Sequence, residues 1–302
     1  MTRTPLVLPA IHIARFAIDE ASANDISDLL AESLDPAETT VAAFEHNGRW
    51  AIELHFLRHP DEGAIRDLVA LTAGKDAVRR LTFATLSPRD WTKASLAGLK
   101  PVEAGRFVVH GGHDRARIAA HRIAIEIEAA LAFGTGHHGT TRGCLLALDR
   151  IARFERPRRI LDVGTGTGVL AIAAAKVFRT PVLASDIDAQ AVAVATANAR
   201  LNHVPSWVEV VHANGLGARR ISARGRYDLI LANILLSPLK RLAAPMAKLI
   251  APNGRIVLSG LLASQASAAL AAYRAQGLAL ERQVTLDNWT TLTLVRRRQP
   301  TA

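Results

Sequence analysis

The segment Ile160-Leu161-Asp162-Val163-Gly164-Thr165-Gly166-Thr167-Gly168 decides the fold of this chain. A short apolar run ends in a carboxylate, a glycine-rich turn follows, and residues 169–178 then have the composition of a buried helix. Glycines in such a turn let the backbone approach a ligand closely, and the ligand lies beside the carboxyl end of the strand. The segment therefore predicts the strand, turn and helix of a ligand-binding α/β fold.

Strands and helices alternate on both sides of this segment. Repeated strand–helix units with apolar strands indicate a parallel sheet with helices on both faces, and two consecutive strands at the end indicate an antiparallel edge. The predicted strands are 107–109, 123–127, 159–163, 182–187, 208–212, 227–232, 255–259, 278–284 and 290–295. The predicted helices are 141–154, 169–178, 189–202, 239–250 and 264–276.

The front of the chain shows a separate pattern of shorter elements. Strands are predicted at 9–18, 41–44, 50–57 and 80–86, and helices at 21–34 and 62–73. Gly74 is expected to close the second helix, and His46-Asn47-Gly48 is a hairpin signal. This β-α-β-β-α-β order resembles a ferredoxin-like sandwich. We therefore expect a small α+β domain at 1–86, a linker at 87–105 and the main α/β domain at 106–302.

The formal charge of the chain, +10, is distributed unevenly. Residues 1–86 contain 8 Lys and Arg against 13 Asp and Glu, a net charge of −5, whereas residues 87–302 contain 29 against 14, a net charge of +15. Phosphate neutralisation dominates nucleic-acid binding, so an acidic front domain suits a basic protein partner. The basic main domain suits a contact with RNA or the ribosome. Charges that form only a solvated surface are an equally good interpretation.

Composition also indicates the compartment. Cys144 is the single cysteine, which excludes an internal disulfide and fits a reducing environment. No apolar run approaches the ~20 residues of a membrane span, and the N-terminus shows no signal segment. These features predict a cytoplasmic protein without a membrane contact. His110, His113, His137 and His138 lack partners at ligand spacing, so we expect no metal site, and we expect Cys144 to pack in the core.

Three details of the glycine turn favour S-adenosylmethionine over a dinucleotide as the ligand. The spacing is G-x-G-x-G instead of G-x-G-x-x-G. Asp162 precedes the first glycine, where a carboxylate can accept bonds from the ligand's ammonium group and would repel a pyrophosphate. Without a ligand, Asp162 would be half-buried and without a partner. We expect Gly164, Gly166 and Gly168 to line the cofactor.

Polar residues follow three further strands. Asp186 lies about 20 residues past the glycines, where a carboxylate can hold both ribose hydroxyls of an adenosine, and Asp188 is expected to cap the next helix. Asn214 suits either an adenine contact or a simple turn. Asn233 follows the strand at which a methyl acceptor must arrive, and its carbonyl can orient an amine for in-line attack. We expect Asn233 to be the catalytic residue.

The turn at 133–141 is expected to fold over the cofactor, with Thr140 or Thr141 capping the following helix. Its sequence, together with the glycine turn, Asp186-Ile187-Asp188, Ala232-Asn233-Ile234-Leu235 and residues 258–265, resembles the bacterial ribosomal protein L11 methyltransferases. The resemblance covers about residues 88–295. Many members have threonine and proline where this chain has His137 and Gly139, a departure that bears on the stiffness of the loop.

The resemblance implies a Rossmann-like seven-stranded methyltransferase domain and S-adenosylmethionine as the cofactor. It implies transfer of several methyl groups to lysine ε-amines and the N-terminal α-amine of ribosomal protein L11, which the front domain would hold. By motif position, Thr141, Gly164, Asp186 and Asn233 are the expected cofactor contacts. A lysine methyltransferase of another protein, a ribosomal RNA methyltransferase and a non-catalytic ribosome-assembly binder stay open as alternatives.

Overall fold

The computed structural model describes residues 11–34, 39–46, 49–56, 58–86, 101–127 and 138–297. These residues fall into two compact units, a front unit of residues 11–86 and a larger unit of residues 101–127 and 138–297. Several predicted features lie outside the described residues. They are the first two residues of the 9–18 strand, the Asn47-Gly48 turn, residues 87–100 of the linker, and residues 133–137 of the loop, His137 included.

The front unit is a four-stranded sheet with helices packed against it. Its elements are β1 (Ile11–Ile18), α1 (Glu20–Ser33), β2 (Thr39–His46), β3 (Arg49–Phe56), α2 (Glu62–Ala73), α3 (Lys75–Arg79) and β4 (Thr82–Leu86). The sheet order is β2-β3-β1-β4, and every pairing is antiparallel. The predicted ferredoxin-like order is therefore confirmed, with α3 as an addition. Gly74 ends α2 as expected, with φ 84°.

The core of this unit is apolar and lies between sheet and helices. Phe16, Ile52 and Leu54 from the strands contact Leu30 of α1 and Val69 of α2, and all five are nearly or fully buried. Burial of this kind is the main stabilising contribution to a domain of this size. Both longer helices begin at aspartates, since Asp19 and Asp61 accept hydrogen bonds from backbone N–H groups of the first turn.

The larger unit begins with a small three-stranded sheet, ordered β5-β6-β7. Its elements are β5 (Val102–Ala104), β6 (Phe107–His110), η1 (Gly112–Arg117) and β7 (Ile123–Glu126). The remainder consists of α6 (His138–Phe154), β8 (Ile160–Val163), α7 (Val169–Phe178), β9 (Val182–Asp186), α8 (Ala189–Leu201), β10 (Val208–His212), α9 (Arg219–Ala223), β11 (Tyr227–Asn233), α10 (Leu236–Leu249), β12 (Ile250–Leu262), η2 (Ala263–Gln265), α11 (Ala266–Arg274), β13 (Ala279–Leu286) and β14 (Trp289–Val295).

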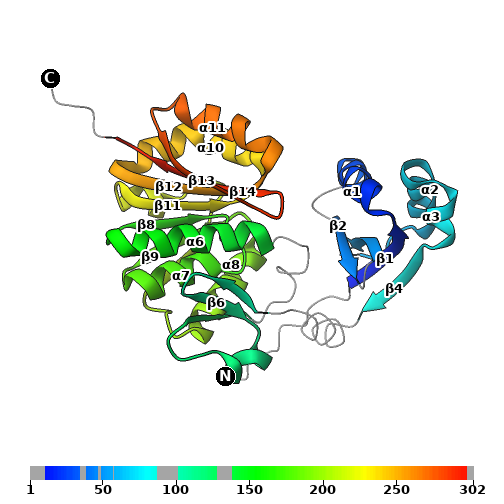
Figure 1. Cartoon of the computed structure of the whole chain (residues 1–302), viewed down its shortest axis with the longest axis horizontal. Helices are drawn as coiled ribbons and strands as arrows, with labels where there is room; N and C mark the ends of the chain where they lie inside the picture. The colour runs from blue at the N-terminus through cyan, green and yellow to red at the C-terminus, as the bar shows by residue number, and fades with distance from the viewer. Residues whose placement is uncertain are drawn as a thin grey trace. The chain divides into compact units, whose positions relative to one another are not determined.

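The large sheet is seven-stranded, in the order β10-β9-β8-β11-β12-β14-β13. The first five strands are parallel, and β14 and β13 add an antiparallel edge. Helices α6, α7 and α8 cover one face of this sheet, and α10 and α11 cover the other (Figure 1). The predicted Rossmann-like α/β fold with an antiparallel edge is confirmed.

Several element bounds differ from those predicted, for reasons of tertiary packing. Val102–Ala104, assigned to the linker, pair with β6 as strand β5. Helix α6 begins at His138, so Thr140 and Thr141 lie inside its first turn and the predicted N-cap role is wrong. Strand β12 is longer than the predicted 255–259 at both ends, because Ile250 pairs with β11 across a register shift and Leu261 and Leu262 pair with β14.

Candidate active site

The carboxyl ends of four parallel strands bring the predicted site residues to one edge of the sheet. In the strand register, Asp162 of β8 lies opposite Leu231 of β11, two residues before Asn233. On the other side, β8 pairs with β9, and Asp186 at the end of β9 lies opposite His212 of β10. We call this edge the carboxyl edge. Ligands of open α/β sheets bind at such an edge.

The glycine turn has two kinds of glycine. Gly164, Gly166 and Gly168 all have positive φ, at 68°, 55° and 84°. A Cβ on Gly164 would lie 2.4 Å from Cγ2 of Ile234, and one on Gly168 would lie 3.1 Å from Cβ of Ala195, so protein packing accounts for both. A Cβ on Gly166 would meet no atom within 4 Å. The backbone at Gly166 is therefore the part of the turn that a ligand can approach.

Asp162 is more deeply buried and better bonded than the sequence suggested. Its side chain is 1% exposed, and Oδ2 accepts hydrogen bonds from the Thr165 hydroxyl (2.6 Å) and the Ala171 backbone N–H (3.1 Å). Asp162 therefore has hydrogen-bond partners without a ligand, and the prediction that it would lack one is wrong. Burial, with a smaller contribution from the nearby charge of Asp186, raises the pKa of the Asp162 carboxyl to about 7.

Asp186 ties the end of β9 to the glycine turn. Its Oδ2 accepts the backbone N–H of Gly166 (2.8 Å), and its Oδ1 accepts that of Asp188 (3.0 Å). Asp188 caps α8 by accepting from Gln190, as predicted. Asn214 is exposed in the loop after β10, and its carbonyl accepts the N–H of Gly217 (3.3 Å). Asn214 therefore takes part in a turn, and its contact with adenine stays a prediction.

Asn233 ends β11 half-buried, with its amide held in one direction. Its Nδ2 donates to the Thr140 hydroxyl of α6 (3.3 Å), which leaves its Oδ1 to accept from another group. Thr140 is 2% exposed, and its backbone carbonyl accepts from the Ser259 hydroxyl (3.3 Å). The Ser259 hydroxyl also pairs with that of Thr291 (2.9 Å). Thr141, the predicted cofactor contact, is 7% exposed in the same first turn of α6.

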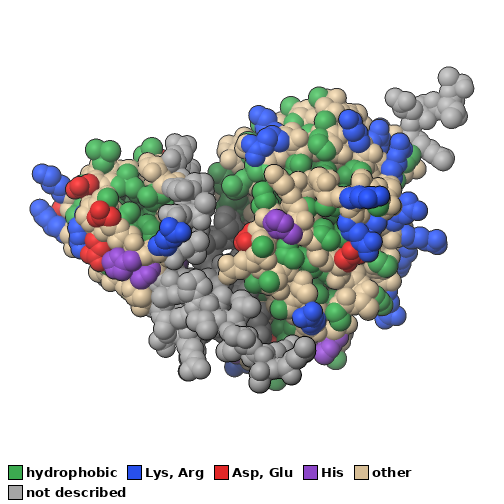
Figure 2. Space-filling view, turned by 180° about the vertical axis from the view of Figure 1, so that it is seen from behind, with side chains coloured by type: hydrophobic (Ala, Val, Ile, Leu, Met, Phe, Trp, Pro, Cys, Tyr) green, Lys and Arg blue, Asp and Glu red, His purple; other side chains and the backbone are tan. Residues whose placement is uncertain are grey.

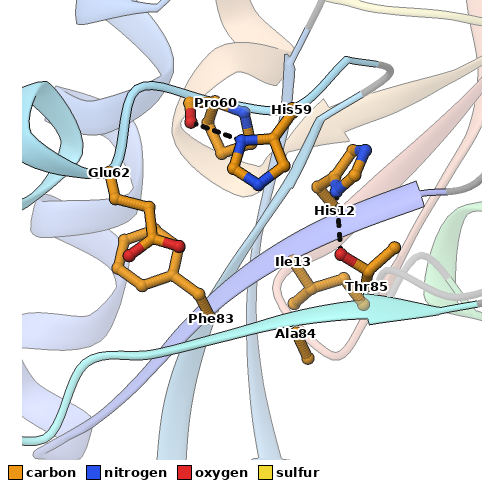
Figure 3. Close-up of a pocket in the computed structure, with 8 residues that line it drawn as sticks. All are labelled: His12, Ile13, His59, Pro60, Glu62, Phe83, Ala84 and Thr85. Atoms are coloured by element: carbon orange, nitrogen blue, oxygen red, sulfur yellow. Dashed lines mark hydrogen bonds between the residues drawn. The ribbon is translucent and has the colours of Figure 1, made fainter.

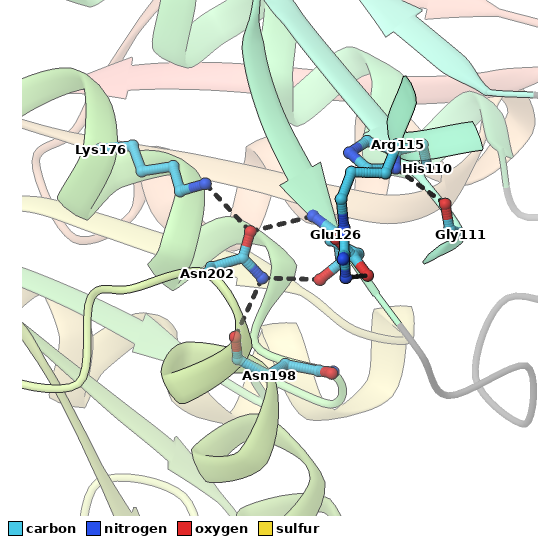
Figure 4. A network of polar contacts seen from close by, with 7 residues as sticks. All are labelled: His110, Gly111, Arg115, Glu126, Lys176, Asn198 and Asn202. Carbon is cyan, nitrogen blue, oxygen red and sulfur yellow. Dashed lines mark hydrogen bonds and ion pairs between the residues drawn. The ribbon is translucent and has the colours of Figure 1, made fainter. Parts of the chain in front are cut away.

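The hydrogen-bonded series Asn233, Thr140, Ser259 and Thr291 was not predicted from the sequence. Its members come from β11, α6, β12 and β14, so no local spacing connects them. Figure 4 shows a second buried network that was missed. The side chain of Asn202 bonds to both the backbone N–H and the carbonyl of Glu126, to Lys176 and to the carbonyl of Asn198. The side-chain amide of Asn198 donates to the Thr167 carbonyl (2.9 Å) and so fixes the glycine turn on α8.

The remaining candidates have structural surroundings. Cys144 is fully buried, as expected, and burial raises the pKa of its thiol to about 12. Within the described ranges, no group of three or more His, Cys, Asp and Glu is placed to hold a metal ion. A small pocket of about 90 Å³ on the front unit contains His12 and His59, whose rings are 4.8 Å apart (Figure 3). It shares no residue with the carboxyl edge.

The residues of the carboxyl edge fit S-adenosylmethionine. The open backbone at Gly166 gives space for the ligand, and the Asp186 carboxylate beside it can accept from hydroxyl groups. A buried carboxylate, Asp162, stands where an ammonium group would be favoured. The exposed apolar side chains of Ile187 (64%) and Leu235 (69%) follow Asp186 and Asn233 and offer apolar contacts.

Comparison with known proteins agrees with this geometry. The model of the ribosomal protein L11 methyltransferase family matches residues 16–297. The chain belongs to this family. A ribosomal protein L11 methyltransferase of Rhodopseudomonas palustris is 55% identical over 285 residues, which is 94% of this chain and 97% of that protein. One from Bradyrhizobium diazoefficiens is 53% identical over the same shares of both chains.

A solved structure supports the same assignment. The ribosomal protein L11 methylase of Lactobacillus delbrueckii subsp. bulgaricus superimposes with a TM-score of 0.58 at 25% identity, covering 66% of this chain and 99% of that one. Membership of the L11 methyltransferase family confirms the resemblance inferred from the motifs, and with it a methyltransferase that uses S-adenosylmethionine. In the parts of the chain that the structure describes, no helix has the length and apolar character to cross a bilayer.

Proposed function

We propose that this chain methylates amino groups of ribosomal protein L11, at lysine ε-amines and the N-terminal α-amine. The observation that carries the proposal is the half-buried Asn233, whose amide nitrogen is bound to Thr140 and whose Oδ1 is left to accept from an amine. Asn233 lies at the end of β11, where we expect the methyl acceptor to arrive. The family of the chain, the L11 methyltransferases, supports this position for the acceptor.

The cofactor contacts follow from the same edge. Of the three glycines proposed to line the cofactor, Gly166 would bring its open backbone against S-adenosylmethionine, and Gly164 and Gly168 would hold the turn in the required course. Asp162 would face the ammonium group of the cofactor. Asp186 would accept from the ribose hydroxyls, with Thr141 and Asn214 as further proposed contacts. When bound, the cofactor supplies the electrophilic methyl group on its sulfonium.

The chain's own residues would select and orient the amine. A lysine amine has a pKa near ~10.4 in water and cannot attack while it is protonated. The apolar side chains of Ile234 and Leu235 follow Asn233, and once a bound substrate excludes water they would disfavour the charged form of the amine and so lower its pKa. Asn233 Oδ1 would accept a hydrogen bond from the neutral amine and direct its lone pair, so that catalysis is mainly alignment.

The first experiment measures the intact mass of purified ribosomal protein L11 after incubation with this chain and S-adenosylmethionine. We expect added methyl groups, and peptide mapping should place them on lysines and the N-terminus. Asn233→Ala should abolish turnover while retaining cofactor binding, and methylation at the wild-type rate would remove Asn233 from the mechanism. Labelling of another protein in a total lysate, or a product sensitive to RNase, would favour the two enzyme alternatives.

The division of labour between the units belongs to this proposal. Residues 1–86 would recognise the substrate, joined by a linker within 87–105 to the methyltransferase domain. Their acidic charge complements a basic ribosomal protein, and the cytoplasm is the proposed place of action. A contact of the basic main domain with RNA or the ribosome is also proposed. Detectable turnover would exclude a purely structural assembly factor.

A further inference from the structure

The edge of the seven-stranded sheet opposite the carboxyl edge is rich in arginine. Arg158 and Arg159 precede β8, Arg179 follows α7, and Arg226 precedes β11, so all four lie where the parallel strands begin. Each of them is exposed. We call these residues the amino-edge arginine cluster. Because they lie at the far end of the strands, they are remote from the cofactor residues.

Hydrogen bonds to the backbone carbonyls of Arg158 and Arg159 hold the segments that carry the cluster side by side. The Thr180 hydroxyl donates to the Arg158 carbonyl (3.3 Å), which places Arg179 next to Arg158. The Arg159 carbonyl accepts the N–H groups of Asp228 and Leu229, which places the start of β11 next to Arg159. The Arg159 guanidinium lies beside Gly225, 3.4 Å from where a Cβ would stand, and so beside the Arg226 backbone.

The guanidinium groups of the cluster form no ion pair among the described residues. Other arginines of the larger unit are matched by carboxylates, since Arg220 and Arg224 pair with Glu209, and Arg255 pairs with Glu155 and Glu281. Within the described residues, no carboxylate forms an ion pair with a member of the cluster. The neighbouring Asp228 uses Oδ2 to accept the backbone N–H groups of Arg158 and Arg159.

Helix dipoles account for part of the charge at this edge but not for the cluster. Basic residues are favoured in the last turn of a helix, as at Arg153, Lys248 and Arg274. Arg158, Arg159 and Arg226 lie outside helices. Arg179 ends α7 with φ 51°, in a left-handed conformation that glycine adopts without the steric cost of a Cβ. The C-cap conformation therefore does not explain why an arginine stands at this position.

We propose that the amino-edge arginine cluster binds the phosphate backbone of RNA. Guanidinium groups form paired hydrogen bonds with phosphate, and several exposed ones at one edge of a sheet suit a repeating anion. The amino edge lies at the left of the larger unit in Figure 1, where β14 ends, and Figure 2 shows Lys and Arg side chains gathered along the corresponding rim on the right. The proposal rests on the proposed function for its choice of RNA, because a ribosomal protein meets ribosomal RNA.

The test measures binding of a fluorescently labelled RNA duplex to the full-length chain at several salt concentrations. The cluster variant is Arg158→Gln/Arg179→Gln/Arg226→Gln. The matched control, Lys75→Gln/Arg79→Gln/Arg80→Gln on the front unit, removes the same net charge from exposed positions. Each phosphate contact contributes about 0.9 to the slope of log K against log salt, so the cluster variant should bind with a slope shallower by about 2.7. The control should keep the wild-type slope.

Outcomes separate this proposal from the proposed function. Equal slopes for the two variants, no duplex binding by the wild type, or capture by phosphatidylserine vesicles in place of RNA would overturn the proposal. Methylation of free ribosomal protein L11 is measured with the same preparations, and the cluster variant should retain the wild-type rate. A wild-type chain that binds the duplex through the cluster but leaves L11 unmethylated would refute the proposed function alone. Circular dichroism checks that both variants are folded.

Discussion

Replacement of Asp162 by asparagine should stabilise the cofactor-free protein above neutral pH. Asp162 is 1% exposed, and burial raises the pKa of its carboxyl group from an ordinary 3.8 to about 7. Below pH 3.8 the group is protonated in both the folded and the unfolded chain, so it costs nothing. Between pH 3.8 and 7 the folded chain keeps a proton that the unfolded chain releases, so stability falls as pH rises. Above pH 7 the loss is complete.

The size of this effect follows from the two pKa values. Moving a carboxyl pKa from 3.8 to about 7 corresponds to about 4 kcal/mol of unfolding free energy, as an order of magnitude. Asparagine keeps an oxygen that can accept from Thr165 and Ala171 and carries no charge at any pH. The free energy of unfolding of Asp162→Asn should therefore exceed that of the wild type above pH 7, and the difference should shrink as pH approaches 4.

Urea unfolding of both proteins between about pH 5 and pH 8.5 measures this difference. Asp149→Asn is the matched control, because Asp149 is also buried (3% exposed) but its ion pairs with Arg106 and Arg153 lower its pKa against the effect of burial. That variant should be destabilised, most strongly at higher pH. Parallel stability profiles for wild type and Asp162→Asn would refute the reasoning. Asp162→Asn should also bind S-adenosylmethionine more weakly in calorimetry, because its ammonium group loses a charged partner.

Three further substitutions test other parts of the carboxyl edge. Asp186→Ala should raise the cofactor dissociation constant about 10- to 100-fold in calorimetry. Asp228→Ala is the control, because Asp228 also accepts two backbone N–H groups but lies at the opposite edge of the sheet, and it should leave the constant unchanged. Thr140→Val should lower kcat about tenfold with little change in cofactor affinity, and Thr140→Ser should restore it, because the hydroxyl orients the carboxamide that ends β11. Gly143→Ala should destabilise the fold by about 1–3 kcal/mol in thermal unfolding, because its Cβ would lie 2.1 Å from Oγ1 of Thr291.

Elements with strong local signals were predictable from the sequence. Helices α2 and α7 and strand β10 have the predicted bounds, since apolar spacing and end residues such as Gly74 and Gly168 mark them locally. The positions of Asp162, Asp186 and Asn233 at one edge were also predictable, because carboxyl ends of parallel strands meet there. Their roles toward a ligand stay predictions.

What the sequence did not predict depends on contacts between distant segments. The first turn of α6 is an example, because it packs against the end of β13, which is distant in the sequence. A Cβ on Gly139 in this turn would lie 2.9 Å from the Leu286 carbonyl oxygen. The partners of Asp162 are another. The sequence shows a carboxylate before a glycine turn. Only the fold shows that the Thr165 hydroxyl and the Ala171 backbone N–H both donate to Oδ2 of Asp162.

The motifs that identified the family are parts of one packing arrangement. Ile234, next to Asn233, lies between two glycines that are far apart in the sequence. A Cβ on Gly164 would lie 2.4 Å from its Cγ2, and one on Gly260 would lie 2.5 Å from its carbonyl oxygen. The glycine turn and the Ser259-Gly260 segment therefore enclose the residue beside Asn233, and Ser259 continues to Thr140 through a hydrogen bond. A larger side chain at either glycine would displace the strand end that carries the Asn233 amide, which gives a physical reason for these three separated motifs to occur together.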